Sequence, residues 1–465
     1  MNSSIVAFYD GGVCLSTCGN TPITEIPKHG IILASESFTE RTSIVSQQLV
    51  EVLNAPEKAE RLDALRRLRT QLPGVPRNNN QVNNHIHTTY SFSPYSPTKA
   101  VYAAWQNGLL TAGIMDHDSI SGAEEFIEAG NVVGIGTTIG FEHRCDMRNT
   151  PFEGRLMNNP DQRSVAYLGM HGIPHQHIGQ VREFIRPYRE KRMERNRAMV
   201  ENINRIPELS GIGLDFDKDV LPISMYHDGG GITERHILFG LAKNMTESIG
   251  AGKAMVDFLK EKLSIPVMGG NLDRLMDAEN NMYSYFLLNV LKGCLVERFY
   301  VDATEECSVP SEFVKFGTEI GAIPTYPYLG DVSDSVTGDK QDHAYEDSYL
   351  DELVEWVARM EFKAVTYTPT RNTYAQITRL MTLCDRHGLF QISGEDINSP
   401  FQPLICEALE KPEFKHLITA TWALIGHEKA ATLRQEDGMF SQETVAKMPG
   451  LPERIAYFAE MGKQR

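Results

Sequence analysis

The sequence predicts an α/β protein in which strand-like and helix-like segments alternate along the chain. Seven short apolar runs have the length and composition of strands, and amphipathic segments suited to helical crossovers lie between several of them. Histidine and carboxylate side chains stand at the ends of four of these runs. Alternation of this kind is typical of a parallel sheet or barrel, and polar residues at the carboxyl ends of barrel strands are typical of an active site.

The expected strands cover residues 82–87, 110–116, 132–142, 165–169, 322–328, 362–367 and 389–393. Ser96 and Pro97 form a good N-cap and first-turn pair for a helix that ends near residue 108. A second helix is expected over about 121–129, closed by Gly130, and a third over about 374–386.

The overall composition limits the class of protein. A chain of 465 residues exceeds one small core, so one large domain with insertions or two to three domains are expected. A net charge of −16 argues against a long nucleic acid or an anionic membrane as partner, and leaves room for a small anionic molecule. No apolar run approaches the roughly 20 residues of a membrane helix, and no leader-like segment opens the chain, so we expect a cytoplasmic protein.

Four polar motifs stand at ends of the expected strands. His85 and His87 are one residue apart on a strand, so they project to the same side and can bind one ion. The same spacing also arises when two histidines merely line one strand face. The later motifs are 116–118 (Asp-His-Asp), 140–142 (Gly-Phe-Glu) and 394–396 (Gly-Glu-Asp), and each adds residue types that bind metals.

Residues from about 179 to 320 interrupt the alternation with long, charged helical patterns. Two interpretations of the basic side chains at its start stay open. They form a solvated helix face, or one or two of them bind an anionic group of a substrate. These side chains are Arg182, Arg186, Arg189, Lys191, Arg192, Arg195 and Arg197.

The four motifs resemble those of the polymerase and histidinol phosphatase (PHP) family. Residues 85–88 (His-Ile-His-Thr) are similar to its first motif and 115–122 (Met-Asp-His-Asp-Ser-Ile-Ser-Gly) to its second. Residues 140–142 resemble the third motif with its bridging glutamate, and 388–396 resemble the last strand. In the insertion, 192–196 (Arg-Met-Glu-Arg-Asn) is similar to an R-x-x-R-N motif, and Arg235-His236 to an R-x-H motif shortened by one residue.

The resemblance implies a distorted (β/α)₇ barrel with an inserted helical subdomain and an N-terminal extension. The segments would be an extension over 1–80, the first part of the barrel over 81–178, a helical cap over 179–320, and the second part with a helical tail over 321–465. The cap is expected over the ligand-bearing rim, because it joins the fourth and fifth strands and must leave and re-enter the barrel near that face.

The chain departs from the family pattern at four positions where further metal ligands are expected. These positions are occupied by Phe92, Ala166, the Pro324–Pro327 segment and Asn398. The resemblance therefore implies one fully supplied divalent ion, Zn, Mn or Fe, whose ligands would be His85, His87, Glu142 and Asp396. A second ion could bind if His143, His171, His175 or His177 supplied substitute ligands.

His117 has lost its usual metal-binding companions, so we expect it to act as an acid or base, although a ligand role stays open. The resemblance also implies that Arg192, Arg195, Arg235 and His236 bind the substrate, a phosphate ester of a small molecule or nucleotide. Two alternatives remain: a hydrolase or lyase of this fold that acts on a non-phosphate substrate, and a metal-retaining binding or regulatory module without turnover. The oligomeric state is not predicted.

Overall fold

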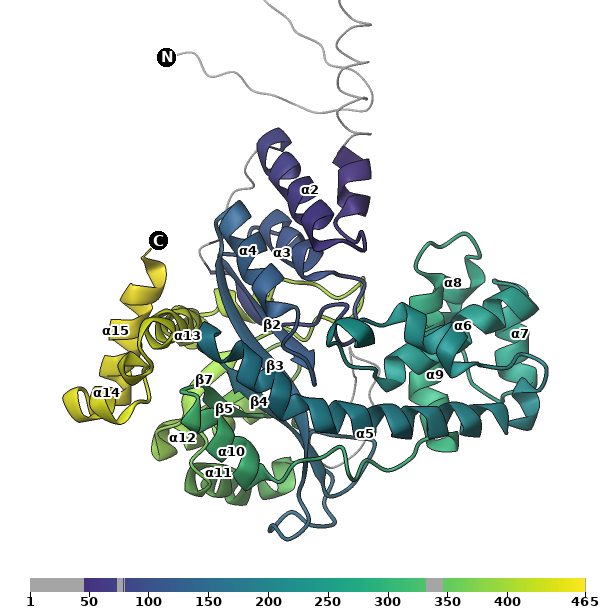
Figure 1. Ribbon diagram of the computed structural model, residues 1–465. Helices are drawn as coiled ribbons and strands as arrows, with labels where there is room; N and C mark the ends of the chain where they lie inside the picture. The colour runs from purple at the N-terminus through teal and green to yellow at the C-terminus, as the bar shows by residue number, and fades with distance from the viewer. Residues whose placement is uncertain (1–45, 73–77, 79, 332–345, 465) are drawn as a thin grey trace, which may run out of the picture. The chain divides into compact units, whose positions relative to one another are not determined.

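The computed structural model describes residues 46–72, 78, 80–331 and 346–464. The chain divides into two compact units, Met1–Gln48 and Leu49–Arg465, and all elements named below lie in the second unit. Seven strands form one mixed sheet in sequence order, which curls into a nearly closed α/β barrel with surrounding helices (Figure 1). The strands are β1 (Val82–Ile86), β2 (Thr111–His117), β3 (Gly136–Asp146), β4 (Val165–His171), β5 (Ile323–Pro327), β6 (Ala364–Tyr367) and β7 (Phe390–Ser393).

The expectation of an all-parallel sheet is wrong at β4, which runs antiparallel to both β3 and β5. Residues 147–164, which join β3 to β4, contain no α-helix, so no crossover returns the chain to the starting end of the sheet. The last residue of β4, His171, pairs with Gly140, two residues before Glu142. The insertion therefore leaves the barrel at the end opposite the expected rim, contrary to the prediction.

The barrel closes through the segment that follows β7. The backbone N–H of His87 donates to the Ile397 carbonyl at 2.9 Å, and the Ile397 N–H donates to the His85 carbonyl at 3.1 Å. Gly394 allows this close approach, because a Cβ at that position would lie 2.6 Å from the His85 Cβ. Closure brings residue 396 beside the two histidines of β1.

The first crossover helix begins where the sequence predicts, whereas the second ends later than predicted. In α3 (Pro97–Gln106) the Ser96 side chain accepts a hydrogen bond from the Lys99 N–H at 3.0 Å, as the N-cap prediction requires. The helix α4 (Ala123–Val133) runs past Gly130 and ends at Gly134, which has a φ of 70°. Gly130 instead permits contact with the sheet, because a Cβ there would lie 2.3 Å from Thr137 Cγ2.

The residues between β4 and β5 are mostly helical. The 27-residue helix α5 (Ile178–Asn204) extends from the barrel, and a group of shorter helices lies towards its far end in Figure 1. These helices share their own apolar core, to which the barrel loops contribute Phe92 and, less deeply buried, Phe401. The remaining helices of the insertion are α6 (Glu234–Ile249), α7 (Lys253–Glu261), α8 (Gly269–Met276), α9 (Tyr283–Leu295) and α10 (Pro310–Glu319).

The other helices cover the outside of the barrel. In the described part of the N-terminal extension, α2 (Lys58–Gln71) packs on α3 and α4 and joins the main apolar core through Leu62, Leu65 and Leu68. The remaining helices are α11 (Leu350–Arg359), α12 (Tyr374–His387), α13 (Lys415–Leu433), α14 (Gln442–Lys447) and α15 (Leu451–Lys463). None of the helices in the described ranges is both long and apolar enough to cross a membrane.

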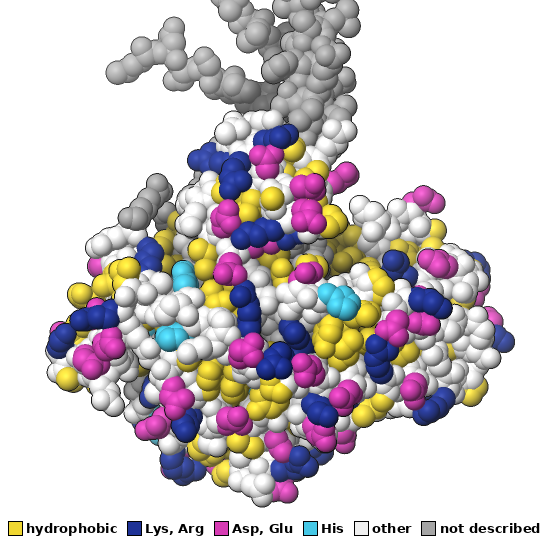
Figure 2. All heavy atoms as spheres, in the orientation of Figure 1, with side chains coloured by type: hydrophobic (Ala, Val, Ile, Leu, Met, Phe, Trp, Pro, Cys, Tyr) yellow, Lys and Arg dark blue, Asp and Glu magenta, His cyan; other side chains and the backbone are white. Residues whose placement is uncertain are grey.

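The surface seen in Figure 2 mixes basic and acidic side chains, and neither sign forms a continuous tract on that face. This distribution agrees with the net charge of −16, which gives no broad basic footprint.

Candidate metal site and pocket

His85 of β1 and His87, the first residue after that strand, meet Glu142 of β3 inside the barrel. His85 Nε2 lies 3.4 Å and His87 Nε2 lies 3.9 Å from Glu142 Oε2. Asp396 Oδ1 lies 3.2 Å from His87 Nε2, because barrel closure has brought residue 396 to β1. Atoms bound to one ion in a tetrahedron with bonds of about 2.0–2.1 Å lie about 3.3 Å apart, so this spacing suits a shared ion.

The unpaired atoms of the cluster support the same conclusion. His85 Nε2 is buried and makes no hydrogen bond to any described residue, although it faces a carboxylate. Buried nitrogen atoms of this kind usually have a partner, and a metal ion would supply one. His85, His87 and Glu142 form a group of side chains that could hold a metal ion.

The charges in the cluster shift the pKa values of its members. Burial lowers the pKa of His85, but the Glu142 carboxylate outweighs this effect and raises it to about 9. Burial raises the pKa of Glu142, whereas the charge of the neighbouring His85 lowers it to about 2. The pKa of Asp396 also falls, because its hydrogen bond and charge interaction with His87 outweigh burial. Two ionised carboxylates beside imidazoles provide a favourable environment for a cation.

Hydrogen bonds behind the cluster fix the ring of His87. Its Nδ1 lies 3.1 Å from Ser91 Oγ, and Ser91 Oγ donates to Asp116 Oδ1 at 2.6 Å. The backbone N–H and hydroxyl of Thr88 also donate to the Asp116 carboxylate, each at 2.6 Å. Hydrogen-bonded carboxylates behind metal-binding histidines set the ring orientation and the tautomer. No sequence pattern distinguishes Ser91 as a functional residue.

His117, at the end of β2, lies against the same carboxylate. Its Nδ1 is 3.4 Å from Glu142 Oε2 and makes no hydrogen bond among the described residues. Its ring centroid lies 4.6 Å from that of His87 and 5.0 Å from that of Tyr167. Burial and the charge of His87 lower its pKa to about 3, so the ring is neutral at pH 7. This position suits either proton transfer or metal binding, so the acid–base assignment stays a prediction.

Three of the four histidines considered as substitute ligands are bonded elsewhere. His143 Nδ1 lies 2.6 Å from Asp118, His175 Nε2 lies 2.8 Å from Glu428, and His177 Nδ1 lies 2.6 Å from Gln180. His171 is different, since its buried Nε2 has no hydrogen-bond partner in the described part of the chain. Burial and then the charge of His85 lower the pKa of His171 to about 3.

The positions that depart from the family pattern hold other interactions. Phe92 packs edge-on against His236 and Phe239 in the core of the insertion. Tyr326 donates a hydrogen bond to the buried Glu346 carboxylate. Asn398 Nδ2 donates to Asp396 Oδ1 at 3.0 Å, so a neutral amide supports a candidate ligand.

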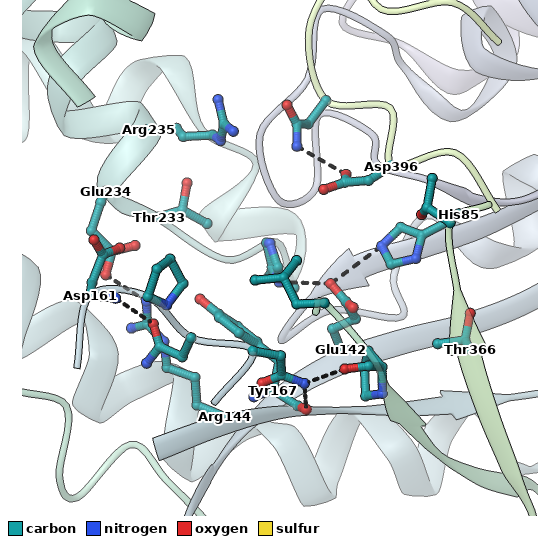
Figure 3. A pocket seen from close by; sticks show the side chains of 18 of the residues that line it. His85, Glu142, Arg144, Asp161, Tyr167, Thr233, Glu234, Arg235, Thr366 and Asp396 are labelled. Carbon is teal, nitrogen blue, oxygen red and sulfur yellow. Dashed lines mark hydrogen bonds and ion pairs between the residues drawn. The ribbon is translucent and has the colours of Figure 1, made fainter. Parts of the chain in front are cut away.

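A pocket of about 170 Å³ opens directly onto the cluster (Figure 3). His85, His117, Glu142 and Asp396 line it from the barrel, and the insertion contributes lining residues from α5, α6 and α9. The insertion therefore borders the site, whereas its limits and those of the other segments stay predictions. The lining residues from the insertion are Arg192, Thr233, Glu234, Arg235, Lys292 and Val296.

The four residues expected to bind substrate divide into two pairs. Arg192 and Arg235 line the pocket, whereas Arg195 and His236 do not. His236 is buried as part of the capping box of α6, where its Nδ1 accepts a hydrogen bond from the Thr233 N–H at 3.0 Å. Burial lowers the pKa of His236 to about 3. The substrate contacts of all four side chains stay predictions.

Arg192 and Arg195 belong to a buried cluster of ion pairs. Arg195 donates to Glu234 at 2.5 Å and to Glu306 at 2.6 Å, and Arg192 donates to Glu234 at 3.2 Å and to Asp118. The charges balance, because three arginines meet three carboxylates. The cluster joins strand ends of the barrel to α5 and α6, and it consists of Arg144, Arg192, Arg195, Asp118, Glu234 and Glu306.

Asp118 connects this cluster to the residue beside it, His117. Its φ of 49° is in the left-handed region that non-glycine residues seldom adopt. Its carboxylate accepts a hydrogen bond from Arg192 and lies 2.6 Å from His143 Nδ1. Burial raises the pKa of Asp118, but the charges of Arg192 and His143 outweigh this effect and lower it. Strained backbone of this kind persists where the surroundings hold it, and it is frequent at functional sites.

Comparisons with known proteins give no family assignment. No protein-family model and no curated protein matches the sequence. Of the solved structures, one described as a candidate metal-dependent phosphoesterase from Bifidobacterium adolescentis aligns at 19% identity, over 72% of this chain and 94% of that one, with a TM-score of 0.46. An amidohydrolase from Chromobacterium violaceum, with bound sulfate and no metal, aligns at 16% identity over 73% and 96%, with a TM-score of 0.47. Likeness this distant assigns no activity to the chain.

Proposed function

We propose that this chain is a metal-dependent hydrolase of the PHP type that cleaves a phosphate ester of a small anionic molecule or nucleotide. The main observation is the grouping of His85, His87 and Glu142, with an unpaired His85 Nε2, at the base of a pocket. The four motifs that resemble the PHP family support the choice of a phosphate ester. Asp396 would complete the ligand set for one ion of Zn, Mn or Fe.

When bound, the ion would supply Lewis-acid chemistry that lowers the pKa of a water and polarises the scissile group. The residues of the chain then have separate tasks. His117 Nδ1 lies 3.4 Å from Glu142 Oε2, beside the expected ion, so the imidazole is placed to accept a proton at one ring nitrogen and release it to the leaving group. Ser91 and Asp116 keep the His87 ring in place during turnover.

The charge of the pocket favours an anionic substrate. Five basic side chains line it, and two of them, Arg144 and Arg192, are already paired in the buried cluster. A divalent ion would add positive charge beside the other three. Arg235 acts on the Asp396 carboxyl, whose pKa it helps to lower, so it lies near the expected ion. An arginine in this position suits a phosphoryl oxygen. The basic side chains are Arg144, Arg192, Arg235, Lys292 and Arg371, and the carboxylates are Glu142, Asp161, Glu234 and Asp396.

A hydrolase or lyase of a non-phosphate substrate is the second candidate. Phe92 and Tyr326 stand where the family resemblance places ligands for further ions, and both are engaged in packing or in a hydrogen bond. One well-placed ion is enough to polarise an amide or a similar group. The class of substrate that reacts distinguishes the two candidates.

Elemental analysis of the chain purified without chelator tests the proposal, together with a screen of phosphate esters and amides. We expect one tightly bound ion per chain, and we expect His87→Ala to lose it along with turnover. His227→Ala is the matched control, because His227 is exposed and does not line the pocket. Two or more ions would show that substitute ligands exist, and a bound ion without turnover on any substrate would favour the binding module.

A further inference from the structure

Tyr167 of β4 is a pocket residue with no role in the proposed function so far. Its ring centroid lies 5.0 Å from that of His117, and the guanidinium carbon of Arg144 lies 5.1 Å from the same ring. Figure 3 shows the side chain pointing into the pocket. Tyr167 is therefore next to the residue expected to move the proton.

The backbone of Tyr167 is fixed by one side chain. Asn158 Oδ1 accepts from the Tyr167 N–H at 2.8 Å, and Asn158 Nδ2 donates to the Tyr167 carbonyl at 2.9 Å. The same Nδ2 donates to the Pro327 carbonyl of β5 at 2.6 Å. Pairing of β4 with β5 begins only at Gly169, so the amide of Asn158 takes the place of a neighbouring strand at this point.

The hydroxyl of Tyr167 differs from the backbone of the same residue in its hydrogen bonding. No group in the described part of the chain forms a hydrogen bond with it, whereas the hydroxyl of Tyr328, in the same pocket, donates to Asp347. Burial raises the pKa of Tyr167 to about 12, although Arg144 opposes the shift. At neutral pH the hydroxyl is therefore a neutral donor that faces the pocket.

We propose that the Tyr167 hydroxyl donates a hydrogen bond to a charged oxygen of the phosphoryl group held at the His85, His87 and Glu142 cluster. This inference rests on the proposed function. A fixed donor that needs no rearrangement stabilises charge on a bound oxygen more effectively than a mobile one.

Tyr167→Phe in the full, metal-loaded chain is the direct test, because it keeps the ring that contacts His117 and Arg144. The probe is inorganic phosphate, measured by calorimetry, with metal content and thermal midpoint recorded in parallel. We expect unchanged metal content and phosphate affinity weakened about 10- to 100-fold, the usual effect of losing a hydrogen bond to a charged group.

Tyr300→Phe is the matched control. Tyr300 also lies under an arginine of the buried cluster, with Arg195 Cζ 5.3 Å from its ring, but it does not line the pocket, and its hydroxyl donates to Gln162 at 3.3 Å. The phosphate affinity of the Tyr300→Phe variant should match that of the unaltered chain.

The outcomes separate this inference from the proposed function. If the unaltered, metal-loaded chain binds no phosphate, the phosphate-ester proposal fails, and the Tyr167 contact fails with it. If the unaltered chain binds phosphate and Tyr167→Phe binds it equally well, only the Tyr167 contact is wrong. Loss of metal in Tyr167→Phe, or equal weakening in Tyr300→Phe, would likewise overturn the contact in favour of a structural role.

Discussion

His117 Nδ1 lies 3.4 Å from Glu142 Oε2, the same distance that separates His85 Nε2 from that oxygen. One carboxylate oxygen is therefore shared between a candidate metal ligand and a candidate acid–base residue. This contact means that the role of His117 must be decided by separating metal binding from turnover.

We expect His117→Gln to retain the metal and to lower turnover by about 10²- to 10⁴-fold, the usual contribution of general acid–base catalysis. Elemental analysis and kcat with the best substrate of the screen measure the two effects. Parallel loss of metal and activity would show that His117 is a ligand. Untouched activity would show that the residue is structural, and His171 would then be the next candidate, since its Nε2 is buried and unpaired among the described residues.

Arg235→Ala should raise KM by about 10- to 100-fold with little change in metal content, because it removes a charged hydrogen-bond donor from the pocket. Arg235→Lys should recover part of the loss, since it keeps the charge without the planar fork. The comparison variant is Arg197→Ala, whose side chain is 42% exposed and pairs with Asp217 outside the pocket. An equal rise of KM in Arg197→Ala would mean that Arg235 acts through the insertion as a whole.

Glu306→Gln should lower the free energy of unfolding by about 3–5 kcal/mol, because it removes the charge that faces two buried arginines. Glu306 accepts from Arg144 at 2.8 Å and from Arg195 at 2.6 Å, and its side chain is 3% exposed. Denaturant unfolding measures the effect. The neighbouring Glu305→Gln is an ideal control, because Glu305 pairs with Lys191 at the surface and should leave stability nearly unchanged. Equal effects from both variants would contradict the role assigned to the buried cluster.

Stability should fall as the pH decreases from about 6.5 to about 4, in part because of His427. Burial lowers the pKa of His427 to about 4, from 6.5, although its hydrogen bonds to the Gly172 and Gly321 backbone oppose the shift. Between these values the unfolded chain binds a proton that the folded chain excludes, so acid favours unfolding. The contribution of His427 to the free energy of unfolding is constant above about pH 6.5, and about 3 kcal/mol of that free energy is lost by pH 4.

Denaturant unfolding across this pH range checks the prediction with His427→Gln, which should show a shallower loss of stability than the unaltered chain. His427 also accepts from the Met439 N–H at 2.9 Å, so the variant starts from a lower stability and only the slope is compared. His227→Gln, at an exposed position, should keep the original slope. If the free energy of unfolding of His427→Gln falls with decreasing pH as steeply as that of the unaltered chain, other groups cause the acid sensitivity.

The sequence by itself determined the features that depend on neighbours along the chain. The strand period placed His85 and His87 on one side of β1, and the Ser96–Pro97 pair marked the start of α3. Both features follow from interactions over a few residues, which side-chain alternation and capping preferences describe well. The family resemblance implied that His85, His87 and Glu142 share one ion, and the structure brings these three side chains together.

Only the tertiary structure decided the features that depend on distant partners. In the sequence, Gly130 has the local appearance of a helix end. In the structure it lies within α4, where the close approach of Thr137 on β3 leaves no room for a Cβ. The arginines at 192 and 195 form a basic helix face in the sequence, yet Arg195 meets Glu234 and Glu306, which are 39 and 111 positions away. Whether such a side chain is solvated, bound to substrate or buried in an ion pair is set by packing between elements, and no local pattern carries that information.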